Sequence, residues 1–341
     1  MGRLLKYTTK RLFFSIFVLV GVSVLIFLIT HVMPGDPARM ALGGRAPEWV
    51  IEELREDMHL NDPVYTQYFY WAKNALNMDF GKSLTTKRDV ILDIKQFLPA
   101  SIELALYTAL FVAIIGIILG TLSGWYANTW LDNTVRVISY IGIITPNFVW
   151  AIFFMLLFGL TLNLFPTVGR FSPGLSYSNQ ITGLFTLDAL ITGNFVLFID
   201  GLKHIFLPSL ALAMGPLAQQ ARLTRISMSD NLQKDFIASV RSYGIPEKII
   251  MFKYLLKPSL IPSVSIFGPT IATIIGGAFL IETIYNWPGL SRYGMNAILQ
   301  KDLNAISAVV LVYSALFIIA NFLVDVVVGY LDPRISMRSS T

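Results

Sequence analysis

Long apolar runs recur along this chain and alternate with polar stretches. The runs cover residues 12–33, 102–126, 137–160, 204–222, 260–281 and 305–330. An α-helix needs about 20 mainly apolar residues to cross a hydrocarbon core of about 30 Å, and each run is close to that length. The pattern therefore predicts an all-α integral membrane protein with six transmembrane helices.

The length of the first apolar run indicates that this part stays in the protein as its first helix. It follows four basic residues, as in a secretory signal, but it exceeds the roughly 7–15 apolar residues of such a signal, so we expect an uncleaved helix. We predict three parts: a tail and first helix over 1–33, an extracytoplasmic segment over 34–100, and a core of five helices over 101–341.

The segment 34–100 has helix signals of its own. Breakers at Pro34, Gly35 and Asp36 end the first helix, and the next helix is expected after Pro47, with the apolar residues Trp49, Ile51, Leu54 and Met58. Asp62 and Pro63 have the pattern of a further helix start. The segment is either a cap over the helix ends or a platform for an external partner.

The predicted spans contain few polar groups. Gly116, Gly120 and Gly124 share one helical face, which favours close helix packing. In the third span, Thr145 and Asn147 flank Pro146, so this part is either a kink satisfied by neighbouring helices or the polar lining of a substrate path. The fourth span carries further candidates for such a path, Gln219 and Gln220.

Charge then orients the predicted helices. The inner segments hold 4, 1, 7 and 2 basic residues, 14 in all, while the short outer segments hold 4 and the long segment 34–100 holds 8. Lys and Arg collect in short cytoplasmic segments, so both termini are expected in the cytoplasm. The same rule explains the net charge of +5, and nucleic acid is not expected as a partner. Membrane lipid is.

Several kinds of chemistry are missing from the sequence. Cysteine is absent, the three histidines are scattered, and Gly81-Lys82-Ser83 lacks the first glycine of a phosphate-binding loop. The acids Glu103, Glu282 and Asp325 fall near the ends of predicted spans, which disfavours a proton-coupled carrier without excluding it. We therefore predict no enzyme activity, metal or cofactor in this chain, and any ATP would be hydrolysed by another subunit.

The stretch 229–262 holds five basic residues, Lys234, Arg241, Lys248, Lys253 and Lys257. Phe236, Val240 and Tyr243 recur at helical spacing, Gly244 suits the left-handed residue that ends a helix, and Pro246 suits the start of the next. The pattern predicts a helix, a sharp turn and a second helix. It is typical either of an amphipathic connector on lipid headgroups or of a protein-binding surface.

This stretch resembles the EAA loop of ABC-importer permeases. Nearly the whole chain is similar to the first, B-type permease subunit of oligopeptide and dipeptide importers, through blocks in the same order: MPGDP, DFGKS, LPASIELAL, TGLFTLDALITGN, HIFLPSLALAMGPLAQQARLTRISM, IETIYNWPGLSRYGMNAILQKDL and DVVVGYLDPR. It departs from the general motif where Glu-Ala-Ala would stand, at Ala238, Ser239 and Val240, and it has Lys257 where proline is usual.

The resemblance implies a type I importer permease in a bacterial or archaeal cell (inner) membrane. Its partners would be a second homologous permease, two ATPases that bind ATP and Mg, and an extracytoplasmic solute-binding protein. The substrate would be peptides, with nickel, glutathione or sugars as alternatives. Residues 229–257 would form the coupling loop, and the positions that match its ATPase contacts or geometry are Asp235, Phe236, Ala238, Ser239, Arg241, Tyr243, Gly244 and Glu247.

Overall fold

Helices make up nearly all of the regular structure. The computed structural model describes residues 2–32, 37–42, 46–57, 59–175, 177 and 180–331. Within these ranges the only β pairing is one isolated antiparallel bridge between Lys82 and Asp89. The predicted breakers at 34–36, Met58 and the tail after residue 331 lie outside the described residues.

Five helices in the described part are long and apolar enough to cross a membrane. They are α1 (Gly2–Val32), the continuous run of α5 (Val90–Phe111), a π-helical turn (Val112–Gly116) and α6 (Ile117–Trp125), then α10 (Phe195–Leu232), α14 (Phe267–Ile284) and α16 (Leu303–Leu331). A sixth span arises only if two further helices, bent by 107° against each other, are counted together. These are α7 (Trp130–Ile144) and α8 (Asn147–Phe154), which a π-helical stretch extends to Thr161.

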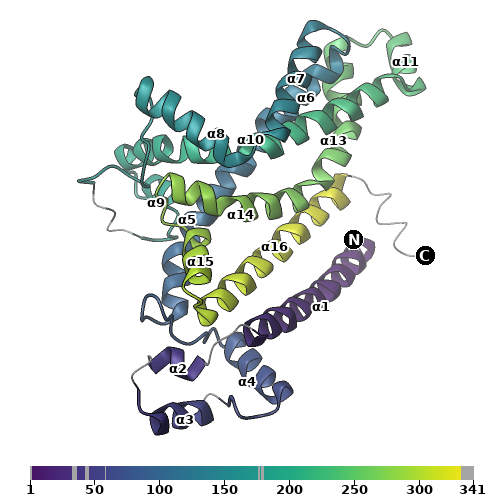
Figure 1. Ribbon diagram of the computed structural model, residues 1–341. Coiled ribbons are helices and arrows are strands. Elements are labelled where there is room, and N and C mark those ends of the chain that lie inside the picture. Colours follow the sequence, from purple (N-terminus) through teal and green to yellow (C-terminus); the bar gives the residue numbers. More distant parts are fainter. Residues whose placement is uncertain are drawn as a thin grey trace.

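The remaining helices are short and connect these elements. They are α2 (Pro37–Leu42), α3 (Glu48–Asp57), α4 (Val64–Leu76), α9 (Phe185–Ile191), α11 (Asp235–Ser242), α12 (Glu247–Ile249), α13 (Leu256–Ser265) and α15 (Leu290–Leu299). Figure 1 shows α2, α3 and α4 at one end of the molecule and α11 at the opposite end, while α16 runs beside α1.

Several predicted boundaries were wrong. The second long helix begins at Val90 rather than at residue 102, and the fourth begins at Phe195 and continues to Leu232, so residues 195–203 are not part of an outer loop. Polar side chains inside these helices caused the errors, because tertiary partners satisfy them. The helix α3 forms as predicted, with Ile51 buried, but Trp49 is exposed. Pro63 precedes α4 rather than opening it, and Asp62 makes no capping hydrogen bond there.

The helix α10 is the central column of the fold. It packs against α5, α6, α7, α8, α9, α13 and α14, and Figure 1 shows it crossing the middle of the molecule. Its closest neighbour is α6, and the predicted glycine face forms this contact. A methyl group on Gly120 would lie 2.5 Å from the Ala221 carbonyl oxygen, and one on Gly124 would lie 2.5 Å from Met228 Cβ.

Residues far apart in the sequence also meet at the end of the molecule near α15. Trp287 and Tyr285 are buried, and they donate hydrogen bonds to the carbonyls of Ala100 (2.9 Å) and Ala151 (3.0 Å). Buried Glu282 accepts from Ser101 Oγ at 2.5 Å. These bonds join the end of α14 and the turn after it to α5 and α8. Breaking any of them would leave a buried polar group without a partner, which is costly.

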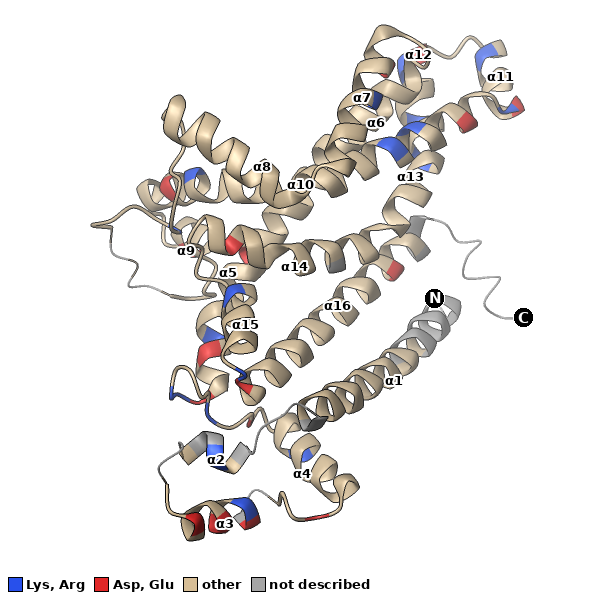
Figure 2. Ribbon diagram, in the orientation of Figure 1, with Lys and Arg blue, Asp and Glu red and all other residues tan. Residues whose placement is uncertain are grey.

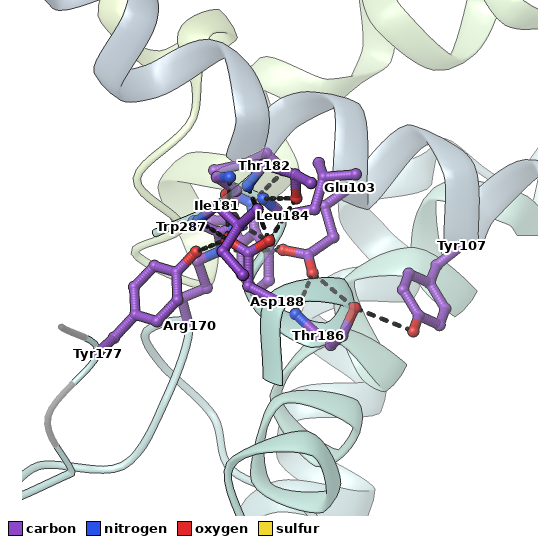
Figure 3. Close-up of polar contacts among 12 residues, drawn as sticks. Glu103, Tyr107, Arg170, Tyr177, Ile181, Thr182, Leu184, Thr186, Asp188 and Trp287 are labelled. Atoms are coloured by element: carbon purple, nitrogen blue, oxygen red, sulfur yellow. Dashed lines mark hydrogen bonds and ion pairs between the residues drawn. The ribbon is translucent and has the colours of Figure 1, made fainter. Parts of the chain in front are cut away.

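Two more carboxylates fix the segment between α8 and α10 (Figure 3). Glu103, buried on α5, accepts from Arg170 Nε at 2.9 Å and from the backbone N–H of Thr186 at 2.7 Å. Asp188 accepts from the Thr182 hydroxyl at 2.6 Å and from the Tyr177 hydroxyl. Burial alone would raise the pKa of Asp188, but these bonds and backbone N–H donors outweigh it and lower that pKa to about 2.

The helix contact gives the first prediction. Gly120→Ala should lower the free energy of unfolding by about 1–3 kcal/mol, because the new methyl group collides with a backbone oxygen that cannot move aside. Thermal melting of the purified protein in detergent measures this. The matched control is Gly21→Ala, whose methyl group would meet nothing within 4 Å and should leave stability equal or slightly higher. Equal losses in both variants would contradict the packing role.

The Asp188 site gives the second prediction. Asp188→Asn should cost about 1–3 kcal/mol at pH 7, because the carboxylate accepts several hydrogen bonds there. The folded pKa lies below the ordinary value of about 3.9, so this stabilisation is complete above about pH 4 and is lost as the pH falls toward 2. The gap between wild type and variant in thermal melting should narrow over that range. Asp230→Asn, at an exposed position of α10, should show no such gap at either pH.

Candidate functional site

The stretch 229–257 folds as a helix, a turn and a second helix. The chain leaves α10 at Leu232, forms α11, turns at Gly244 and enters α12, which continues through a π-helical stretch (Ile250–Leu255) into α13. Asp235 lies in the first turn of α11 and Arg241 in its last, which suits the helix dipole. In Figure 2 blue ribbon segments, which mark Lys and Arg, lie on α11, α12 and the adjoining part of α10, with a few red ones among them.

Gly244 has the left-handed conformation that its position predicts. Its φ is +70°, and its N–H donates to the Arg241 carbonyl at 2.9 Å. A methyl group there would meet nothing within 4 Å, so the backbone angle, and not crowding, favours glycine. Pro246 directly precedes α12, as Pro63 precedes α4, so it lies just before the first turn in which it was predicted.

The buried face of α11 differs from the predicted one. Ile237 is completely buried and packs in a small core with Met228, Ile250, Met251 and Leu255. Phe236 and Tyr243 are instead 40% and 83% exposed, so their predicted apolar stripe is wrong. The helix has only two turns. Ile237 is its buried residue, and partly buried Val240 packs against the same core, which joins α11 to α10 and to the helical stretch before α13.

The outer side of this segment is polar and aromatic. All eight residues that match the coupling loop are exposed: Asp235, Phe236, Ala238, Ser239, Arg241, Tyr243, Gly244 and Glu247. Arg241 makes a two-point ion pair with Glu247, at 2.9 and 3.1 Å, across the Gly244 turn. An exposed pair of this kind contributes only about 0–1 kcal/mol, but its two bonds orient α12 relative to α11.

The bend between α7 and α8 forms a second candidate site. Thr145, Asn147 and Gln219 line one pocket of about 320 Å³, together with Thr270 and Thr273 of α14. The sequence analysis missed the two threonines, although their three-residue spacing after Gly268-Pro269 places them on one helical face. The pocket offers hydroxyl and amide groups, and its lining includes no charged side chain.

Gln220 does not join this pocket. It is completely buried against Gly116, and neither its side-chain oxygen nor its nitrogen has a hydrogen-bond partner among the described residues. Successive residues on a helix point about 100° apart, so Gln219 and Gln220 face different neighbours.

The described part of the chain contains no group of three His, Asp or Glu side chains that could hold a metal ion.

Comparison with known proteins identifies the family. The model of the "Binding-protein-dependent transport system inner membrane component" matches residues 116–337, and the model of the N-terminal part of such membrane components matches residues 4–105. The first match includes the stretch 229–257 and the pocket at the bend.

Three relatives match along nearly their whole length. The dipeptide transport system permease protein DppB of Alkalihalophilus pseudofirmus is 36% identical over 332 residues, 97% of this chain and 99% of the relative. The probable D,D-dipeptide transport system permease protein DdpB of Escherichia coli K12 is 36% identical over 326 residues, 96% of each chain. The glutathione transport system permease protein GsiC of the same strain is 31% identical over 335 residues, 98% of this chain and 100% of the relative.

The two family models together cover most of the chain, and the structure carries several membrane-spanning helices in the part they match. The chain belongs to the inner-membrane permease components of binding-protein-dependent transport systems.

Proposed function

We propose that this chain forms one half of the translocation path of an ATP-driven peptide importer. A second, homologous permease supplies the other half, two ATPases bind beneath residues 229–257, and a solute-binding protein delivers the peptide from outside. ATP and Mg belong to the ATPases, and this chain contributes no cofactor. The observation that carries the proposal is the exposed helix–Gly244–helix segment, at the opposite end of the molecule from α2–α4.

The packing of that segment supports a mechanical role. Ile237 ties α11 to α10 and to the helix that leads into α13, so a push on α11 moves both. The helix α10 has 38 residues and is therefore roughly 57 Å long at 1.5 Å per residue. Gln219 of the polar pocket lies on this helix, and the same helix ends at Leu232, next to α11. Although α10 contains Pro208 and Pro216, its part from Gln219 to Leu232 has no proline, and this part links the polar pocket to α11 as one continuous helix.

The proposed topology has six spans, with α7 and α8 counted as one broken span. Both termini and residues 229–257 are cytoplasmic, and residues 34–100 are extracytoplasmic, in a bacterial or archaeal cell membrane. The gathering of Lys and Arg near α11 supports this orientation through the positive-inside rule.

The substrate follows from the relatives and from the pocket. Relatives of this length are named for dipeptides, and Thr145, Asn147 and Gln219 suit the amide groups that all peptides carry. The names of the glutathione relatives favour a second candidate, the tripeptide glutathione. Nickel and sugars remain weaker alternatives. A proton-coupled carrier stays disfavoured, because Glu103 and Asp132 are ion-paired with Arg170 and Arg225, and Glu282 accepts hydrogen bonds from Ser101 and from the backbone N–H of Arg292.

Gly244 gives the test of coupling. Gly244→Val should abolish ATPase assembly and peptide uptake in membranes, because the left-handed backbone costs a side chain about 1–2 kcal/mol and the turn would change shape. Gly193→Val is the matched control: Gly193 also has a left-handed φ (+68°) and open space around it, but it lies in the turn between α9 and α10. Uptake retained in the Gly244 variant would contradict the coupling role.

The substrate has a separate test. The purified importer should hydrolyse ATP several-fold faster with a peptide-loaded binding protein, but not with nickel-loaded or sugar-loaded ones. Stimulation only by a glutathione-loaded binder would favour the second candidate. Uptake by this chain alone along a pH gradient, without the ATPases, would support the proton-coupled carrier instead.

A further inference from the structure

A second pocket, of about 220 Å³, lies between α7 and α10, nearer to α11 than the polar pocket. Three arginines gather in its lining, which consists of Val135, Arg136, Ser139, Tyr140, Ala221, Arg222, Arg225 and Ile226. Neither the coupling segment nor the polar pocket at the bend includes any of these residues. Arg225 links α10 to α7 through Asp132, whereas Arg136 and Arg222 lie outside the close contact of Gly142 with Ala218.

The arginines are held in place by their neighbours. Buried Asp132 accepts two hydrogen bonds from Arg225, at 2.5 and 2.8 Å, and one from Ser123 at 2.7 Å. Arg136 lies 3.6 Å from the same carboxylate, and its Nε is buried without a hydrogen-bond partner among the described residues. Arg222 is exposed at the rim. Two guanidinium groups therefore share one carboxylate, and Arg222 adds a third positive charge at the rim, so this pocket has an excess positive charge.

The two pockets are neighbours along α7 and α10. Gln219 lines the polar pocket, and Arg222, one turn further along α10, lines the cationic one. On α7, Ile143 and Ile144 of the polar pocket follow Ser139 and Tyr140 by four residues. Residues three and four apart share a helical face, so the same sides of α7 and α10 form both pockets. From the bend toward α11, the linings of the two pockets change from uncharged hydroxyl and amide groups to arginines.

We propose that Arg136, Arg222 and Arg225 form a binding site for the C-terminal carboxylate of a peptide on its way out of the path. The choice of ligand rests on the proposed function. Every linear peptide with a free C-terminus carries a carboxylate, and guanidinium groups bind carboxylates in a two-point geometry. The polar pocket would contact the backbone amides of the same peptide, and the arginines would draw its charged end toward the ATPase side.

A fluorescence titration tests the site. The chain has no cysteine, so Val137→Cys, at an exposed position of α7 beside the site, can be labelled alone with an environment-sensitive dye when the partner subunits are also free of reactive cysteine. The complete permease–ATPase assembly is placed in nanodiscs of neutral lipid. Dialanine should give a saturable change, and dialanine amide should bind about tenfold more weakly or not at all.

The variants are Arg136→Gln and Arg222→Gln, which leave the Asp132–Arg225 pair intact. Each should weaken dialanine binding about tenfold, whereas Arg39→Gln, on the distant helix α2, should not change it. Equal binding of dialanine and its amide, or no response to either, would overturn the proposal. A response only to short-chain phosphatidylglycerol or inorganic phosphate would also overturn it, and would identify the arginines as contacts for lipid or free phosphate.

The proposed function is read separately in the same preparation. If a peptide-loaded binding protein still stimulates the ATPase of the unmodified assembly while dialanine has no effect on the dye, the carboxylate site is wrong and the importer function stands. If neither occurs, both are wrong.

Discussion

The fold depends on how closely α6 approaches α10. Three glycines on one face of the second long helix bring its backbone against the backbone and short side chains of α10, with no room for even one methyl group at Gly120 or Gly124. In lipid there is little hydrophobic force between helices, so close contact of this kind is a main source of helix association. The helices α5, α7, α8, α13 and α14 then arrange themselves around the same column.

The fixed column has consequences at both ends. At one end, Ile237 anchors α11 in a small core against α10, so the exposed side chains of Phe236 and Tyr243 are presented on a firm support. At the other end, buried Glu103 connects the segment before α10 to α5, and buried Asp188 holds the loop of that segment through the Thr182 hydroxyl (Figure 3). Between these ends α10 and α7 contribute to two neighbouring pockets, a polar one at the bend and a cationic one nearer α11. The proposed coupling thus runs along the part of α10 between Gln219 and Leu232, which contains no proline.

The sequence predicted the local features well. Apolar run length located the long helices, glycine spacing located the α6–α10 contact, and Gly244 followed from the steric rule for left-handed residues. Features that depend on distant partners were missed. The run lengths gave no sign that α10 begins at Phe195, and the 107° bend at Pro146 exceeds the kink that one proline indicates. Partners such as Glu103 and Thr186, or Ser101 and Glu282, lie 83 and 181 residues apart, and no local pattern joins them.

The central claim is that the exposed face of α11 is where an ATPase binds, and cross-linking from a single cysteine tests it most directly. Tyr243→Cys would carry a short photoactivatable linker in the assembled importer, and Leu299→Cys, 71% exposed on α15, would carry the same linker as the control. The account predicts that position 243 cross-links to an ATPase subunit, with a lower yield when ATP binding changes the interface. It predicts no cross-link to an ATPase subunit from position 299. Cross-links to lipid alone from position 243, with the ATPases present and active, would contradict it.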